Sequence, residues 1–401
     1  MKRSLSLPSL IKNSRFSSST TFSRSSSLLQ TRIEVQKINH SLNIVNSGLL
    51  QIQSQSQLQS RLTNKSFTAS YTQSQIRSYT NTTPKNPSKM STSQPQAPPS
   101  FKKGNTALIT GGASGIGLSL AETCLKYGMN VIVVDNNGDE LGKAQMYLSG
   151  LITGEGEGEQ QVVGLNVDVG NLEEWDAVKE TVEGEFDGKL HLLALNAGMS
   201  QRGTIGTPTS PAYFQKILSV NLFGVLNGLN TLLPFITSHS SPSSIIITGS
   251  KQGITNPPGN PAYNMSKSAV KTLAEHLSWD LREKKEKFVH LLIPGWAYTG
   301  LAGSGSAFVV KENGGETEVQ RAGLENKPKG AWSGDQVVEY LLGKMNEDVF
   351  YVVCPDGEVT EEMDRKRIAW GAGDLVHGRQ PLSRWREEYK GEFEEFMKRD
   401  L

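Results

Sequence analysis

Short apolar stretches recur along the chain from about residue 104, and amphipathic stretches lie between them. Several are continuously apolar rather than alternating, for example 131–134 and 245–247. Strands covered on both faces have this pattern, which is typical of a parallel sheet between two layers of helices. It predicts seven strands, at 106–110, 130–135, 162–167, 190–195, 244–248, 288–293 and 349–354.

The segments between these strands carry apolar residues at helical spacing, most clearly at 270–281. Strands alternating with helices form right-handed crossovers. The pattern therefore predicts a single α/β domain over 101–360, a doubly wound seven-stranded parallel sheet of the Rossmann type. Such a sheet binds its ligand outside the carboxyl ends of its strands.

Two stretches do not follow this alternation. Residues 300–330 are rich in glycine and charge, and a long connection without its own periodicity predicts a mobile lid over the site. Residues 361–401 carry scattered aromatic residues among charges. We expect this tail to pack on the domain or at a subunit interface.

The first hundred residues differ in composition from the rest. They hold twelve of the 41 basic residues and one of the 40 acidic residues, which leaves 29 basic and 39 acidic residues in 101–401. Many polar and few aromatic residues predict a disordered leader over 1–100. Its basic, Ser-rich start is typical of a mitochondrial transit peptide, cut after Tyr79 or near Arg15; a solvated low-complexity tail is the alternative. Translation from Met1 predicts a matrix protein, and initiation at Met90 predicts a cytoplasmic one.

The composition argues against several classes of protein. A net charge of +1 gives no sign of a nucleic-acid binder. The sequence contains no run of eighteen apolar residues, so no membrane-spanning helix is predicted. Cys124 and Cys354 lie in apolar patterns and are expected to be buried thiols. No metal site is predicted, because the histidines are not spaced along the chain as metal ligands are. They are His191, His239, His276, His290 and His377.

A glycine-rich turn follows the first predicted strand and opens a helix. Its sequence is Thr110-Gly111-Gly112-Ala113-Ser114-Gly115-Ile116-Gly117. Glycines let the backbone approach a pyrophosphate closely, and the helix N-terminus presents free N–H groups to it. The strand–turn–helix context favours a dinucleotide site over a turn without a ligand.

Two carboxylates at predicted strand ends refine this site. Asp135 ends the second strand, where it can accept hydrogen bonds from ribose hydroxyls and repel a 2′-phosphate. Ser114 and Asn136 offer no basic group for that phosphate, so NAD is favoured over NADP. Asp168, followed by Val169, can bind the adenine amino group. A strand-end cap at Asp135 and a turn at Asp168 are the alternatives.

Tyr263 and Lys267 lie one helical turn apart, thirteen residues after Ser250. A free phenol has a pKa of ~10, and a neighbouring ammonium is expected to lower it. Ser250 would donate to a substrate oxygen while Tyr263 transfers the proton. With the glycine-rich turn, this group predicts a nicotinamide-dependent oxidoreductase of alcohols or carbonyls.

These motifs resemble the short-chain dehydrogenase/reductase family over about residues 102–355. The resemblance rests on Thr110-Gly111-x-x-x-Gly115-x-Gly117, Asp168-Val169, Asn196-Ala197-Gly198, Asn221, Ser250, Tyr263-x-x-x-Lys267, Pro294-Gly295 and Thr299. It implies a catalytic tetrad formed by Asn221, Ser250, Tyr263 and Lys267.

The resemblance also implies roles that the residues alone do not show. Asn196 would support the central sheet beside the cofactor, together with Ala197 and Gly198. Asn221 would bend its helix and hold a water in a proton relay through the lysine. The nicotinamide would be bordered by Pro294, Gly295 and Thr299. A homo-dimer or homo-tetramer is the expected assembly.

The substrate is defined only as a class. Segments 199–209, 252–260 and 296–298 and the 300–330 lid are expected to face it, which suits a secondary alcohol, a ketone or a hydroxy-lipid. An NADP-dependent carbonyl reductase and a cofactor-binding subunit without catalysis are the alternative functions. A largely apolar pocket is predicted from Gln252, Ile254, Pro257, Pro258, Trp296, Tyr298 and Phe308.

Overall fold

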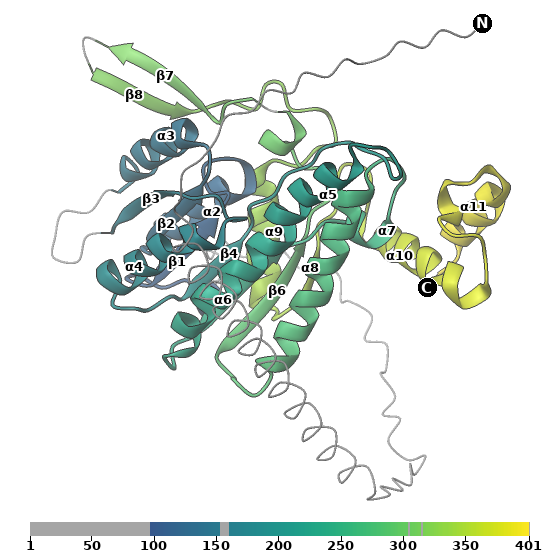
Figure 1. The fold of residues 1–401 in the computed structure, drawn as a ribbon, viewed down its shortest axis with the longest axis horizontal. Coiled ribbons are helices and arrows are strands. Elements are labelled where there is room, and N and C mark those ends of the chain that lie inside the picture. The colour runs from purple at the N-terminus through teal and green to yellow at the C-terminus, as the bar shows by residue number, and fades with distance from the viewer. Residues whose placement is uncertain (1–96, 153–159, 304, 314–315, 401) are drawn as a thin grey trace, which may run out of the picture. The chain divides into compact units, whose positions relative to one another are not determined.

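The computed structural model describes residues 97–152, 160–303, 305–313 and 316–400. A seven-stranded parallel sheet runs through it in the order β3-β2-β1-β4-β5-β6-β9 (Figure 1). The doubly wound fold and all seven predicted strands are confirmed. The strands are β1 (Thr106–Thr110), β2 (Asn130–Asp135), β3 (Val162–Asn166), β4 (Leu192–Leu195), β5 (Ser243–Thr248), β6 (Lys287–Ile293) and β9 (Tyr351–Val353).

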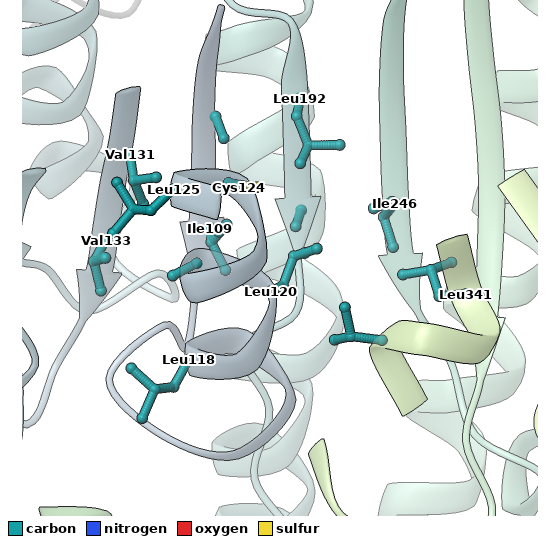
Figure 2. Close-up of a cluster of buried hydrophobic side chains, with 14 of the residues drawn as sticks. Ile109, Leu118, Leu120, Cys124, Leu125, Val131, Val133, Leu192, Ile246 and Leu341 are labelled. Atoms are coloured by element: carbon teal, nitrogen blue, oxygen red, sulfur yellow. The ribbon is translucent and has the colours of Figure 1, made fainter. Parts of the chain in front are cut away.

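Helices cover both faces of the sheet, because successive strand residues point to opposite sides. Ile109 of β1 belongs to one core layer and Leu108 to the other. The first layer packs α2 (Gly115–Lys126), α3 (Gly138–Ser149) and α9 (Gly334–Asn346) on the sheet. In Figure 2, Leu118 and Leu120 of α2 lie over the strands that carry Ile109 and Leu192. The second layer packs α4 (Trp175–Glu185), α6 (Gly224–Thr237) and α8 (Pro261–Asp280).

Shorter helical elements lie between these strands and helices along the chain. The helix α5 (Ser210–Leu218) continues through a π-helical turn, Ser219–Phe223, into α6. By length and composition alone, the stretch Ser210–Thr237 is apolar enough to cross a membrane. Its residues Leu232 and Ile236 are fully buried in the second core layer, so it serves as a helix of this fold. The short helix α7 (Gln252–Thr255) follows β5.

The segment 300–330 differs from its prediction. It contains an antiparallel hairpin, β7 (Phe308–Asn313) paired with β8 (Glu316–Arg321), where an irregular lid was expected. Phe308 is buried against Tyr147 of α3, with ring centroids 5.6 Å apart. Arg321 forms ion pairs with Glu122 of α2 at 2.9 Å and with Asp335 of α9 at 2.8 Å. The hairpin is therefore docked on the first helix layer, and the expected lack of regular structure was wrong. Of the predicted lid, Gly300 and Leu301 line the cavity described below, and its mobility stays a prediction.

The tail beyond residue 360 is helical. It consists of α10 (Glu361–His377) and α11 (Lys390–Lys398), joined by short 3-10 turns. Trp370 of α10 is buried and packs against Phe393 and Phe396 of α11, with ring centroids 5.4 and 5.3 Å away. The tail thus has its own small aromatic core.

At the other end, the fold begins before the predicted boundary of the leader. Ser100 is fully buried, and its hydroxyl is 2.8 Å from that of Ser244 on β5. The rest of the predicted leader, up to residue 96, lies outside the described residues.

Candidate active site

A cavity of about 1370 Å³ opens at the carboxyl end of the sheet. The strands β1 and β4 are neighbours, but the chain runs from β1 to β2 on one side and from β4 to β5 on the other. Doubly wound sheets bind their ligands where the strand order reverses in this way. The volume exceeds the ~300–1000 Å³ of a typical small-ligand pocket, so the cavity has room for a dinucleotide and a substrate. Its walls come from loops after β1 to β6 and include Gly111, Asp135, Asp168, Val169, Asn196, Ser250, Pro294 and Gly295.

The glycine-rich turn between β1 and α2 is shaped for close approach of a ligand. Gly111 and Gly115 have φ angles of 63° and 53°, a region that glycine adopts without strain. A Cβ atom at Gly117 would lie 2.2 Å from the carbonyl oxygen of Gly111. Ser114 and Ile116 line the cavity at the start of α2, where N–H groups lack partners within the helix. This turn fits the pyrophosphate of a dinucleotide.

A hydrogen-bond network joins the ends of β1, β4 and β5 at the cavity. Asn196 donates through Nδ2 to the carbonyl oxygens of Thr110 and Gly111, at 3.2 and 3.3 Å. Its Oδ1 accepts from Thr248 Oγ1 at 3.2 Å. The Thr110 hydroxyl oxygen accepts from the N–H groups of Asn196 and Ala197, at 2.9 and 3.0 Å. Asn196 therefore holds three strand ends together beside the cofactor turn.

Asp135 and Asp168 line the cavity and also hold backbone N–H groups. Asp135 accepts from Ala113 at 3.2 Å and from Asn137 at 3.1 Å. Asp168 accepts from Gly170 at 2.9 Å. The capping and turn roles are thus present at both positions. A carboxylate has about four acceptor sites, so each residue keeps sites for a ligand in the cavity.

Asn221 lies in the π-helical turn, a feature that often marks functional sites. It is fully buried, and its Oδ1 accepts from the N–H of Met199 at 2.8 Å. Its Nδ2 donates to the carbonyl oxygen of Met199 and to Ser266 Oγ, each at 3.0 Å. A Cβ atom at Gly198 would lie 3.5 Å from both Asn221 Oδ1 and Lys267 Nζ. Asn221 therefore lies just behind the cavity wall, close to Lys267.

Ser250, Tyr263 and Lys267 meet in one wall of the cavity. The end of β5 delivers Ser250, and one face of α8 presents the other two. The Ser250 hydroxyl lies near enough to the Tyr263 phenol to lower its pKa. Lys267 Nζ lies 5.8 Å from the centroid of the Tyr263 ring and donates to the carbonyl oxygen of Thr248 at 2.8 Å. The structure thus brings the predicted acid/base group together, with Asn221 behind it.

Burial governs the protonation of both α8 residues. It raises the pKa of Tyr263, and the hydrogen bond with Ser250 opposes that rise. It lowers the pKa of Lys267 to about 8. We expected the lysine to lower the phenol pKa, but loss of solvent has the larger influence and acts in the opposite direction.

The substrate side of the cavity matches the prediction in part. Three residues expected there, Ile254, Tyr298 and Phe308, do not line it. Ile254 packs in the second core layer and Phe308 in the first. The backbone N–H of Tyr298 donates to the carbonyl oxygen of Trp332. Of residues 305–313 and 316–330, none lines the cavity. The lining residues on this side include Met199, Ser200, Gln252, Pro257, Pro258, Trp296 and Leu301.

Three charged residues in the wall, Lys216, Lys251 and Asp356, were missed from the sequence, whereas Arg202 lies in the segment 199–209 that was expected there. Lys251 and Asp356 line the cavity and form an ion pair of 2.9 Å, and Arg202 and Lys216 line it as well. The one local signal for Lys251 in the sequence was its position directly after Ser250. Among the described residues, no cluster of His, Cys, Asp or Glu could hold a metal ion.

A dinucleotide-shaped turn on a doubly wound sheet, next to a Ser–Tyr–Lys group, defines a nicotinamide-dependent oxidoreductase. The family model for short chain dehydrogenases matches residues 105–307. The chain belongs to this family. The matched region ends just before the hairpin, so α9, β9 and the helical tail lie beyond it.

Relatives carry both alcohol dehydrogenase and reductase names. The NADP-dependent (R)-specific alcohol dehydrogenase of Lentilactobacillus kefiri is 28% identical over 200 residues, which are 50% of this chain and 75% of that protein. The C alpha-dehydrogenase of Sphingobium sp. strain SYK-6 is 26% identical over 266 residues, 65% of this chain and 83% of that protein. A short-chain dehydrogenase/reductase from Burkholderia phymatum, solved in complex with NAD, has a TM-score of 0.56 at 25% identity and covers 70% of this chain and 97% of its own.

Proposed function

We propose that this protein transfers a hydride between NAD(H) and a secondary alcohol or ketone, with Tyr263 as the general acid and base. The observation that carries the proposal is the meeting of Ser250, Tyr263 and Lys267 in one cavity with the glycine-rich turn. When bound, the nicotinamide supplies or accepts the hydride. The chain supplies the proton and the orientation of the substrate.

The proposed proton transfer follows from the positions of the side chains. Ser250 and Tyr263 both border the cavity, so a substrate oxygen can bind to both hydroxyls. Burial keeps the phenol protonated at neutral pH, ready to donate to an alkoxide forming during reduction. In oxidation the phenolate accepts the proton, and Lys267 stabilises its charge only below the lysine's own pKa of about 8. Oxidation should therefore accelerate as pH rises toward the pKa of Tyr263.

Turnover and binding test this proposal on the purified protein. We would titrate NADH by fluorescence and screen secondary alcohols, ketones and hydroxy-lipids by nicotinamide absorbance. Tyr263→Phe should lower kcat by about 10²-fold or more, because it removes the acid/base group, yet bind NADH as the wild type does. Equal turnover in that variant would refute the role of Tyr263. Tight NADH binding without turnover on any compound would favour a cofactor-binding subunit.

NAD is the proposed cofactor because of Asp135. Its carboxylate lines the cavity, where it would repel a 2′-phosphate, and the neighbouring wall residues Ser114 and Asn136 are uncharged. Asp135→Asn keeps the shape and removes the charge. We expect the ratio of the NADPH to NADH dissociation constants to fall about tenfold, or ~1.4 kcal/mol. A wild type that binds NADPH more tightly than NADH would contradict the preference.

Import into mitochondria and a homo-oligomeric assembly are also proposed. The import proposal rests on the basic, acid-poor composition of the leader and applies to the chain translated from Met1. A reporter fused to residues 1–89 should enter mitochondria, and a diffuse cytosolic signal would favour initiation at Met90. Sedimentation of the purified protein tests the assembly, and a monomer at all concentrations would reject it.

A further inference from the structure

Lys251 follows the catalytic serine directly but has no part in the proposed proton transfer. Its side chain is 14% exposed, and its Nζ lies 2.9 Å from Asp356 Oδ1 and 2.5 Å from Asp364 Oδ2. Asp356 follows β9, and Asp364 lies in the first turn of α10, with its side chain 4% exposed. Burying such charges costs more desolvation energy than surface ion pairs do. Their place beside the active site calls for a role other than stability.

The ion pairs hold the segment 294–296, which lines the cavity. The N–H of Lys251 donates to the carbonyl oxygen of Pro294 at 3.2 Å. Asp356 Oδ2 accepts from the N–H of Trp296 at 2.5 Å. Gly295 lies between these bonds, and a Cβ atom there would be 2.2 Å from Asp356 Oδ2 and 2.8 Å from Lys251 Nζ. The ion pair therefore packs directly on this segment and fixes its position.

The same turn fixes the hydroxyl of Ser250. The N–H of Gln252 donates to Ser250 Oγ at 3.2 Å, and the N–H of Gly253 donates to the Ser250 carbonyl oxygen at 3.0 Å. The carbonyl oxygen of Lys251 accepts from the N–H of Thr255 at 2.9 Å. Lys251 is thus a fixed point of the turn that orients Ser250, and a displacement of Lys251 moves the serine hydroxyl.

We propose that Lys251, Asp356 and Asp364 form an ion-pair triad that positions Ser250 against Tyr263. The proposal rests on the function proposed for these two residues. It makes the first turn of α10 a support of the active site. Lys251, Asp356 and Asp364 are positioning residues, since they act through Ser250.

Charges from the tail complete the surroundings of the triad. Arg367 Nη1 lies 3.9 Å from Asp364 Oδ1, and Arg384 from the turn after α10 is near the same carboxylate. Asp364 therefore faces Lys251 and cations from the tail, whereas Asp356 is paired with Lys251. Removal of Lys251 leaves Asp364 with cations from the tail alone, which should draw it away from the turn of Ser250.

Substitution at Lys251 tests the triad against a matched control. Lys251→Met keeps the length and removes the charge, and should lower kcat about tenfold to a hundredfold, because small misplacements at a reacting centre have effects of that size. NADH binding should change far less. Lys251→Arg should recover much of the rate. The control Lys271→Met breaks a 2.6 Å ion pair with Glu275 on α8, away from the cavity, and should leave kcat unchanged.

The pH profile distinguishes positioning from a simple charge effect. The hydrogen bond with Ser250 lowers the pKa of Tyr263, so a displaced Ser250 shifts the profile of alcohol oxidation to higher pH. The charged residues that line the cavity with Tyr263 are Lys267 on α8, Lys216 on α5, and Asp135, Asp168, Arg202, Lys251 and Asp356.

Asp364→Asn separates the two effects. Loss of a negative charge alone would shift the profile to lower pH, whereas loss of positioning shifts it to higher pH. A shift to lower pH, or a reduced rate with an unmoved profile, would overturn the proposal.

Hydrogen exchange tests the triad without a substrate. Peptides that cover 249–255 and 294–297 should exchange faster in Lys251→Met and Asp364→Asn than in the wild type, and should not change in Lys271→Met. Unaltered exchange overturns the triad whether or not a substrate is known. Faster exchange in these variants supports the triad as a support of the loop. If Tyr263→Phe nevertheless retains turnover, the proposed function is refuted and the triad is not.

Discussion

Replacing Lys267 by methionine should stabilise the fold at neutral pH while it abolishes turnover. Burial lowers the pKa of this lysine from 10.5 to about 8. At ~1.36 kcal/mol per pKa unit, its charge costs about 3 kcal/mol of folding free energy at pH 7. Methionine has a similar length and no charge, so the variant avoids this cost.

One contact of Lys267 opposes the gain. Lys267 Nζ donates to the buried carbonyl oxygen of Thr248 at 2.8 Å. Methionine leaves that oxygen without this donor, which costs about 1–2 kcal/mol. The variant should therefore be more stable than the wild type by about 1–2 kcal/mol at pH 7.

The sign of this difference depends on pH. Between the folded pKa of about 8 and the unfolded value of 10.5, the unfolded chain binds more protons than the folded protein. The Lys267 contribution to stability therefore rises with pH across this window. Lys267→Met has no such contribution, so its advantage shrinks from pH 8 upward. Above the window only the lost hydrogen bond counts, and the variant becomes the less stable protein.

Urea unfolding without nicotinamide, followed by tryptophan fluorescence at pH 7 and near pH 10, measures both differences. The surface variant Lys271→Met serves as control and should change stability by less than ~1 kcal/mol. A Lys267→Met protein that is less stable than the wild type at pH 7 would refute the reasoning. So would a difference that is the same at both pH values.

Three further substitutions test the fold around the site. Gly117→Ala places a Cβ 2.2 Å from the Gly111 carbonyl oxygen, so NADH titration should show binding weakened by about tenfold or more, ~1.4 kcal/mol. Phe308→Ala should lower the free energy of unfolding by about 3–5 kcal/mol yet leave NADH binding unchanged; weaker binding would place the hairpin at the site. Trp370→Ala should cost a similar ~3–5 kcal/mol and also lower kcat, because Asp364 lies on the same helix.

The sheet could be predicted because its signal is local. A continuous apolar run such as 131–134 identifies a strand buried on both faces without knowledge of its neighbours. The hairpin gave no such signal, because β8 mixes charged and polar residues with few apolar ones. Its stability comes from distant partners, such as the pairing of Arg321 with Glu122 and the packing of Phe308 on Tyr147. Tertiary contacts of this kind decide β structure where local preference is weak.

The acid/base residues were predictable for the same reason. Tyr263 and Lys267 are four residues apart on one helix, so their proximity follows from helical geometry. The pair of Lys251 and Asp356 joins residues 105 positions apart, and no local pattern reveals it. The pKa of Tyr263 was predicted in the wrong direction because the sequence shows its charged neighbour but not the extent of its burial.

The proposed acid/base residues and the proposed positioning residues come from different parts of the chain. Ser250, Tyr263 and Lys267 lie within the family match, which ends at residue 307, whereas Asp356 and Asp364 lie beyond it. Both carboxylates bind the lysine next to Ser250, and Asp356 also holds Trp296 beside the cavity. Changes in the tail should therefore alter turnover through the position of the serine, even where every acid/base residue is intact. If the proposed triad positions Ser250, a complete Ser–Tyr–Lys motif does not by itself set the geometry of this site.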